Sequence, residues 1–199
     1  MAYRWASSSL PAMVDITPFS VQSTAIDGLM VMQVKEVRDE RGVVREFFRQ
    51  SAFDDARLPS LGPWLQMNLT QSKAGAIRGL HGEAMNKLVG VVSGEAFGAY
   101  VDARSDSPTV GNVVTVPLVI GTQVLVPKGV CNGFQSVTDT QYFYAFDREW
   151  VPGMPGYGVC PMDPALAIPW PVAVDLSTFD QVSEKDANAP TLAEVLASA

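Results

Sequence analysis

The stretch from residue 76 to residue 93 carries the side chains best suited to chemistry in this chain. It holds the only histidine, His81, with Arg78 three residues before it and Lys87 six residues after it. A neutral imidazole takes up and returns protons near neutral pH, and two neighbouring cations favour a site that binds or develops negative charge. A histidine within a strand is also often purely structural, so the rest of the chain must decide between these two interpretations.

Length and composition indicate one globular domain. The chain has 199 residues, of which 47% are hydrophobic and 18% charged, which suits a single substantial core. The net charge of −7 argues against nucleic acid as the main partner, because phosphate backbones bind basic faces. No apolar run approaches the roughly 20 residues that span a bilayer, so we expect no membrane partner. Cys131 and Cys160 are too few for a disulfide framework, and no signal-peptide pattern precedes them, so a cytoplasmic location is expected.

Short β-type segments separated by turn signals occupy the middle of the chain. Their spacing of about eight to twelve residues indicates an all-β sandwich or barrel. We expect short peripheral helices at residues 51–58, with Ser51 as N-cap, and at residues 191–198, with Thr191 as N-cap. Residues 1–20 are expected to form a loose extension, and residues 21–199 a single domain. The predicted strands cover residues 29–34, 43–49, 64–70, 76–80, 87–92, 96–103, 112–119, 122–126 and 140–147.

Several common chemistries lack the residues that they require. Catalytic zinc or non-haem iron sites typically use two or three histidines with a carboxylate, and this chain has one histidine and no cysteine pair. We therefore expect no metal. The sequence contains no GxSxG motif and no glycine-rich phosphate loop, which argues against serine hydrolases and against nucleotide triphosphatases. Proton transfer by His81 is the chemistry that remains.

Abstraction of a proton next to a carbonyl needs a base, a partner that fixes its tautomer, and donors for the developing enolate oxygen. Inversion of such a centre also needs an acid on the opposite face. Besides His81 and Lys87, the chain offers several tyrosines and carboxylates, which are Tyr100, Tyr142, Tyr144, Tyr157 and Asp163 among others. Residue types alone leave open which of these side chains meet.

A series of short motifs resembles the nucleotide-sugar 3,5-epimerases, whose type member is dTDP-4-dehydrorhamnose 3,5-epimerase. The similarity extends from about residue 26 to residue 195, and each motif occurs in the order that the family has. The motifs are DERG at 39–42, QxN at 66–68, RGLH at 78–81, KLVxVVxGE at 87–95, VDxRxxSPTxG at 101–111, PxGxxxGF at 127–134, DPALxIxWP at 163–171 and SEKDANAPTL at 183–192.

The resemblance implies an all-β, cupin-type jelly roll that forms a homodimer and acts on a nucleotide sugar without metal or cofactor. It assigns His81 as the base that removes the C3 and C5 protons of a 4-keto-6-deoxy sugar. Asp163 corresponds to the aspartate that holds the base, Lys87 to the lysine beside the keto oxygen, and Tyr144 to the acid on the other face.

The same resemblance assigns the residues that bind the substrate. Arg41 and Arg78 correspond to arginines associated with the diphosphate, with Arg41 acting across the dimer, and Glu46 and Asn68 correspond to pocket positions. Two positions depart from the family. Asn132 stands where the family usually has a histidine, and Trp150 stands where it often has a tyrosine that stacks on the base. An asparagine can donate a hydrogen bond there but cannot shuttle a proton at neutral pH.

The sequence therefore predicts a cofactor-independent epimerase of a dTDP-4-keto-6-deoxy sugar that inverts C3, C5 or both. Two alternatives stay open. One is a 3,4-keto-isomerase that moves the carbonyl of a nucleotide sugar, and the other is a cupin that binds a sugar nucleotide without turnover.

Overall fold

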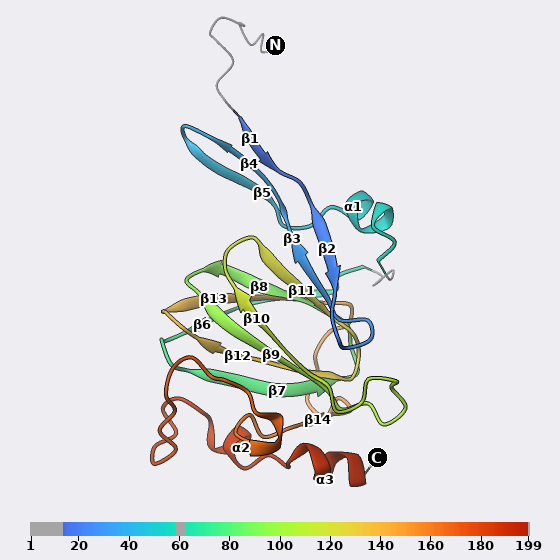
Figure 1. The fold of residues 1–199 in the computed structure, drawn as a ribbon, viewed down its shortest axis with the longest axis vertical. Coiled ribbons are helices and arrows are strands. Elements are labelled where there is room, and N and C mark those ends of the chain that lie inside the picture. Colours follow the sequence, from blue (N-terminus) through green and yellow to red (C-terminus); the bar gives the residue numbers. More distant parts are fainter. Residues whose placement is uncertain (1–13, 59–62, 199) are drawn as a thin grey trace, which may run out of the picture.

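The computed structural model describes residues 14–58 and 63–198, and within them the fold consists almost entirely of antiparallel strands (Figure 1). Three short helices and one 3₁₀ turn lie at the periphery, which confirms the predicted all-β class. In chain order the elements are β1 Asp15–Thr17, β2 Ser20–Ser23, β3 Met30–Gln33, β4 Lys35–Asp39, β5 Gly42–Glu46, α1 Gln50–Asp55, β6 Gln66–Ser72, β7 Ile77–Glu83, β8 Lys87–Ser93, β9 Ala96–Asp102, β10 Val113–Leu118, β11 Thr122–Val126, β12 Val130–Ser136, β13 Thr140–Phe146, β14 Gly156–Gly158, η1 Pro164–Leu166, α2 Glu184–Ala187 and α3 Leu192–Ala197.

Two large sheets face each other and form the jelly roll. One sheet has the strand order β10-β9-β12-β7-β14 and the other has the order β2-β3-β11-β8-β13-β6. The core between them is aliphatic and aromatic, and the rings of Phe134 on β12 and Tyr142 on β13 stack across it with centroids 3.8 Å apart. Burial of each such large side chain contributes about 1.5–3 kcal/mol, so this core holds the two sheets together.

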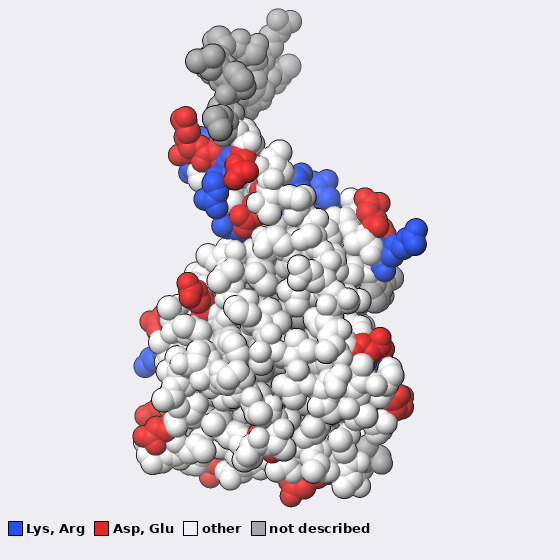
Figure 2. Space-filling view, viewed as in Figure 1, with Lys and Arg blue, Asp and Glu red and all other residues white. Residues whose placement is uncertain are grey.

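A third, smaller sheet of strands β1, β4 and β5 projects from the jelly roll as an arm (Figure 1). Charged side chains gather on the arm and near α1, whereas the jelly-roll face turned to the viewer in Figure 2 is largely uncharged. Part of the expected loose extension belongs to this sheet, because Asp15–Thr17 pair with β4. Residues 1–13 of that extension lie outside the described residues.

Local sequence signals predict the start of α3 correctly but not the start of α1. Helix α3 begins after Thr191, which confirms the predicted N-cap, and the structure adds a capping box between the side chains of Thr191 and Glu194. Helix α1 begins one residue earlier than expected, at Gln50, and Arg49 rather than Ser51 occupies the N-cap position without a side-chain cap. Strand β12 was not among the predicted strands, because Pro127, Gly129 and Gly133 give that region the composition of a loop.

The VDxRxxSPTxG motif builds a buried polar network at the end of β9. The side chain of Asp102 is fully buried and accepts two hydrogen bonds from Arg104 at 2.8 Å, one from Ser107 at 2.5 Å and one from Thr109 at 2.6 Å. Burial alone would raise the pKa of Asp102, but these donors outweigh it and hold the pKa well below its usual range. The motif thus fixes the loop that links β9 to β10.

Replacement Asp102→Asn is expected to lower the free energy of unfolding at pH 7 by about 3–5 kcal/mol, because Arg104 then loses its buried counter-charge. The native pKa of Asp102 lies below its unfolded value, so the network stabilises the fold above about pH 4 and is lost as pH falls through the native pKa. The difference between wild type and variant should therefore shrink on acidification.

Urea unfolding between pH 2 and pH 7 measures this difference. Asp106→Asn, at an exposed position of the same loop, serves as the control and should stay within about 0.5 kcal/mol of the wild type. A variant as stable as the wild type at pH 7 would contradict the assigned role of the network.

Candidate active site

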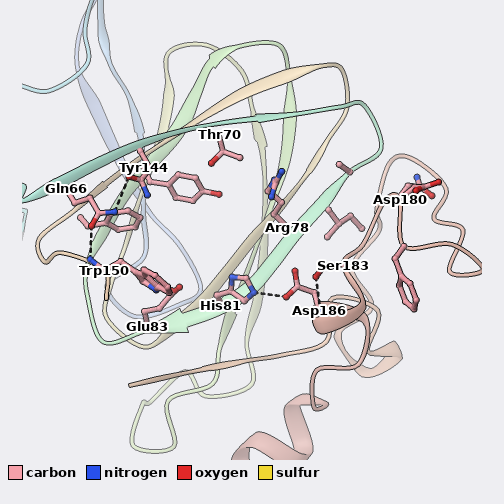
Figure 3. A pocket seen from close by; sticks show the side chains of 16 residues that line it. Gln66, Thr70, Arg78, His81, Glu83, Tyr144, Trp150, Asp180, Ser183 and Asp186 are labelled. Atoms are coloured by element: carbon pink, nitrogen blue, oxygen red, sulfur yellow. Dashed lines mark hydrogen bonds and ion pairs between the residues drawn. The ribbon is translucent and has the colours of Figure 1, made fainter. Parts of the chain in front are cut away.

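A cavity of about 500 Å³ opens beside β6 and β7 and holds His81 (Figure 3). Strands β6, β7 and β13 form its walls, and the segment from Phe179 to Ser183 together with α2 covers one side. A second cavity of about 640 Å³ adjoins it on the β14 side and shares His81, Glu83, Trp150 and Asp186. The histidine therefore lies where two open volumes meet.

An irregular stretch of β7 around Gly79 places Arg78 and His81 at the same cavity. Residues three apart in a regular strand point to opposite faces. Here the register with β12 shifts between Asn132, which pairs with His81, and Phe134, which pairs with Arg78. Gly79, in this irregular stretch, has a φ of +114°, and a Cβ there would lie 2.6 Å from the Cα atom of Gly133. Only glycine therefore permits this approach of β7 to β12.

The imidazole of His81 is held by Asp186, with 2.8 Å between Nε2 and Oδ1 (Figure 3). Ser183 caps α2 and its Oγ accepts the backbone N–H of Asp186 at 3.1 Å, which sets this carboxylate toward β7. Burial would raise the pKa of Asp186, but the hydrogen bonds of its carboxylate, first among them that of His81, outweigh it and lower the pKa. Asp186 is therefore ionised at neutral pH.

An ionised carboxylate only accepts hydrogen bonds, so Nε2 of His81 must carry the proton in the neutral ring. Nδ1 then holds the lone pair. Among the residues that the structure describes, no side chain or backbone group is hydrogen-bonded to Nδ1. The geometry thus provides a base whose Nε2 is held by a carboxylate and whose Nδ1 is free to take up a proton.

Tyr144 lies across the cavity from His81, on β13 of the opposite sheet (Figure 3). Burial raises the pKa of its hydroxyl, although Arg78 acts in the opposite direction. The phenol therefore stays protonated at neutral pH and can act as an acid. Its neighbour Ala145 is buried in a separate cluster with Leu88, so the register of β13 presents Tyr144 and not Ala145 to the cavity.

Lys87 and Asn132 line the inner part of the site. A small inner chamber of about 60 Å³ is lined by His81, Glu83, Lys87, Asn132 and Tyr144 together with three neighbouring residues. Nζ of Lys87 is hydrogen-bonded to Oδ1 of Asn132 at 2.5 Å and forms an ion pair with Glu83. A cation, its counter-charge and an amide are thus fixed within reach of the base.

Polar and aromatic side chains line the outer part of the cavity. Nε of Arg78 donates to Oγ of Ser72 at 2.8 Å, while the residue stays exposed at the cavity wall. Asn68 on β6 accepts a hydrogen bond from Gln66 at 3.1 Å, and the Trp150 ring is half exposed at the junction of the two cavities. Three of the predicted substrate-binding residues, Asn68, Arg78 and Trp150, therefore line the same cavity.

The prediction that Asp163 holds His81 is wrong. One carboxylate oxygen of Asp163 accepts the backbone N–H of Ala165 at 3.0 Å, and the other accepts that of Leu192 at 2.9 Å. Asp163 thus caps η1 and tethers the start of α3, which is the ordinary behaviour of an aspartate before a proline turn. The carboxylate that contacts His81 belongs to Asp186, and the prediction missed it although SEKDANAPTL was one of the matched motifs.

Arg41 and Glu46 lie outside the cavity of their own chain. Arg41 sits in the β4–β5 turn of the arm, with its side chain 90% exposed and paired with Asp39 at 2.5 Å. Glu46 ends β5, where it pairs with Lys35 at 3.4 Å and with Arg49. Sequence reasoning also missed Glu83, which shares a strand face with His81 because the two residues are two positions apart.

The arrangement suits the transfer of a proton to and from carbon. It combines an oriented base, a protonated phenol on the opposite sheet and a cation with an amide beneath them. Within residues 14–58 and 63–198, no three His, Cys, Asp or Glu side chains are grouped so that they could hold a metal ion, and no helix is long and apolar enough to cross a bilayer.

Comparisons with known proteins indicate one family of enzymes. A family model described as dTDP-4-dehydrorhamnose 3,5-epimerase matches residues 23–194. The dTDP-4-dehydrorhamnose 3,5-epimerase of Salmonella typhimurium is 33% identical over 183 residues, which cover 88% of this chain and 97% of that protein. The dTDP-4-dehydro-6-deoxyglucose 3-epimerase of Streptomyces bikiniensis is 34% identical over 164 residues, which cover 78% of this chain and 80% of that protein.

A solved structure is similar over nearly the whole fold. The dTDP-6-deoxy-D-glucose-3,5-epimerase of Legionella pneumophila, crystallised with dTDP-4-keto-L-rhamnose, has a TM-score of 0.79 and 32% sequence identity. The similarity covers 89% of this chain and 97% of that one. The jelly roll and the site described above thus lie within the region that these proteins share.

Proposed function

The chain belongs to the dTDP-4-dehydrorhamnose 3,5-epimerase family, and on that premise we propose that it is an isomerase that inverts C3, C5 or both of a dTDP-4-keto-6-deoxy sugar. The observation that carries the proposal is the contact of His81 with Asp186 at the edge of a cavity that Tyr144 closes from the other side. Both carbons lie next to the C4 ketone, which makes their protons acidic enough for a histidine base.

The reaction proceeds through an enolate. Nδ1 of His81 removes the proton from C3 or C5, and the electron pair of the broken C–H bond moves toward the C4 oxygen. Asp186 stabilises the imidazolium that forms. The hydroxyl of Tyr144 then delivers a proton to the opposite face of the same carbon, and solvent restores both residues. Only protons move, so the reaction as proposed calls for no cofactor or metal.

The nucleotide part of the substrate is assigned to the outer cavity. Arg78 offers a guanidinium to the diphosphate, Asn68 offers an amide, and Trp150 offers an indole face for stacking on the base. A nucleotide sugar and two free cysteines fit a protein of the reducing cytoplasm, which we propose as its compartment.

The exchange of deuterium from solvent tests this function. With dTDP-4-keto-6-deoxyglucose in D2O, the wild type should incorporate deuterium at C3, C5 or both with inversion, as read by proton NMR. Asp186→Asn should slow exchange on the order of 10²–10⁴-fold, because the amide no longer fixes or stabilises the protonated imidazole.

Asp163→Asn is the matched control for this experiment. It should leave exchange near the wild-type rate and lower thermal stability, because Asp163 caps backbone groups and does not contact His81. Equal rates for Asp186→Asn and the wild type would contradict the mechanism. A 3-keto product would identify a keto-isomerase, and binding of dTDP without exchange would identify a non-catalytic cupin.

We further propose a homodimer in which the arm of one chain lies along β6 of the other. Strand β6 is an edge strand, and Leu65, Met67 and Leu69 beside the cavity are 54%, 62% and 58% exposed. The arm exposes apolar side chains as well, with Ile16 at 56% and Val44 at 69%. Apolar edges of this kind favour pairing with a second chain, and a two-fold interface would bury both.

Such a dimer would bring Arg41 to the cavity of the partner chain, where its own chain cannot place it. Mixed dimers test this. Arg41→Ala and His81→Asn should each be nearly inactive alone, and co-expression should restore about a quarter of wild-type activity, because half of the dimers are mixed and each has one complete site.

Sedimentation should give the mass of two chains for the wild type and for both variants. Activity that stays absent in the mixed sample would contradict the role of Arg41 across the interface. A monomeric wild type would contradict the dimer itself.

A further inference from the structure

The ammonium group of Lys87 has no hydrogen-bond donor left for a substrate. Lys87 is 4% exposed, and its Nζ contacts the backbone oxygen of His81 at 3.2 Å, Oδ1 of Asn132 at 2.5 Å and the carboxylate of Glu83. An ammonium carries three N–H donors and no acceptor, so these three partners use all of them. A direct contact between Lys87 and the keto oxygen would require one of these bonds to break.

The contact with Lys87 also fixes the orientation of the Asn132 amide. Because the ammonium cannot accept a hydrogen bond, the atom at 2.5 Å must be the carbonyl oxygen of the amide, and Nδ2 points the other way. Asn132 is 5% exposed and lines the inner chamber. Over the part of the chain that the structure describes, Nδ2 donates no hydrogen bond, and it is not among the buried polar atoms that lack a partner, so its N–H groups are available to a molecule in the chamber.

The position of Asn132 relative to the base completes the argument. Asn132 on β12 is the direct cross-strand partner of His81 on β7, so their side chains leave adjacent backbone positions. Tyr144 lines the same chamber from the opposite sheet. A sugar carbon between His81 and Tyr144 would therefore place the neighbouring carbonyl oxygen close to the free N–H groups of Asn132.

We propose that Nδ2 of Asn132 donates the hydrogen bond that stabilises the enolate oxygen, and that Lys87 is a positioning residue that holds this amide in place. The inference rests on the proposed epimerase function. As the C–H bond breaks, its proton goes to His81 and its electron pair forms the C=C bond of the enolate. The carbonyl π electrons move onto the oxygen, and the amide N–H groups of Asn132 donate hydrogen bonds to this developing negative charge. Glu83 balances the charge of the Lys87 ammonium group, and the Asn132 amide is itself a neutral donor.

Rates of deuterium exchange in four variants test the proposal. Asn132→Asp keeps the shape of the side chain and an oxygen for Lys87 but loses both donors, and Asn132→Ala removes the amide. Each should lower kcat for exchange on the order of 10²–10³-fold with little change in KM. Lys87→Met should cause a similar loss, and the Lys87→Met/Asn132→Ala double variant should be no slower than the slower single variant.

Two controls separate this role from general damage to the fold. Asn112→Ala changes an exposed asparagine just before β10 that lines none of the cavities described above and donates to the backbone oxygen of Ala25, and it should exchange at the wild-type rate. Asn132→His should retain part of the activity and add a new limb to the pH profile of kcat near pH 6.5, because the donor itself then titrates.

Three outcomes would overturn the proposal. Exchange by Asn132→Asp and Asn132→Ala within about threefold of the wild type would remove the amide from the reaction. Losses that multiply in the double variant would mean that Lys87 reaches the oxygen by itself. A wild type that incorporates no deuterium would reject the epimerase function, and this failure is distinct because it appears before any variant is compared.

Discussion

The hydrogen bond between His81 and Asp186 is the contact on which the rest of the site depends. It joins the central part of a jelly-roll strand to a helix of four residues near the C-terminus, 105 positions away in sequence. The jelly roll supplies the rigid position of the imidazole, and the short helix supplies the carboxylate that selects its tautomer. Neither part alone forms an oriented base, so the C-terminal segment belongs to the site and does more than cover the barrel.

The buried cation of the inner site is balanced by a carboxylate. Lys87 pairs with Glu83 and donates to Asn132, and all three residues line the inner chamber, while the imidazole of His81 is held by Asp186. A buried cation without a counter-charge would be costly, whereas a paired one fixes the groups around it. The exposed cations near the site are Arg78, which lines both the large cavity and the inner chamber, and Arg41, which lies on the arm.

Much of the fold could be predicted from the sequence, because short apolar strands alternate with turns throughout its middle. The N-cap of α3 is a local signal, and Thr191 was predicted correctly in that position. The carboxylate that contacts His81 was predicted wrongly, because Asp163 and Asp186 both stand in motifs that match the family. Only the path of the folded chain brings Asp186, and not Asp163, to β7. Arg78 and His81 reach the same cavity because the strand is irregular around Gly79. The alternating pattern of a regular strand would place these two residues on opposite faces, so it could not predict this.

The chain has a single histidine, so its tautomer can be measured without ambiguity. Nitrogen-15 NMR of the wild type labelled at histidine, recorded at a pH where the ring is neutral, tests the central claim most directly. The account predicts a protonated Nε2 and an unprotonated Nδ1, and it predicts that Asp186→Asn abolishes this preference. A proton on Nδ1 in the wild type, or the same spectrum in Asp186→Asn, would contradict it.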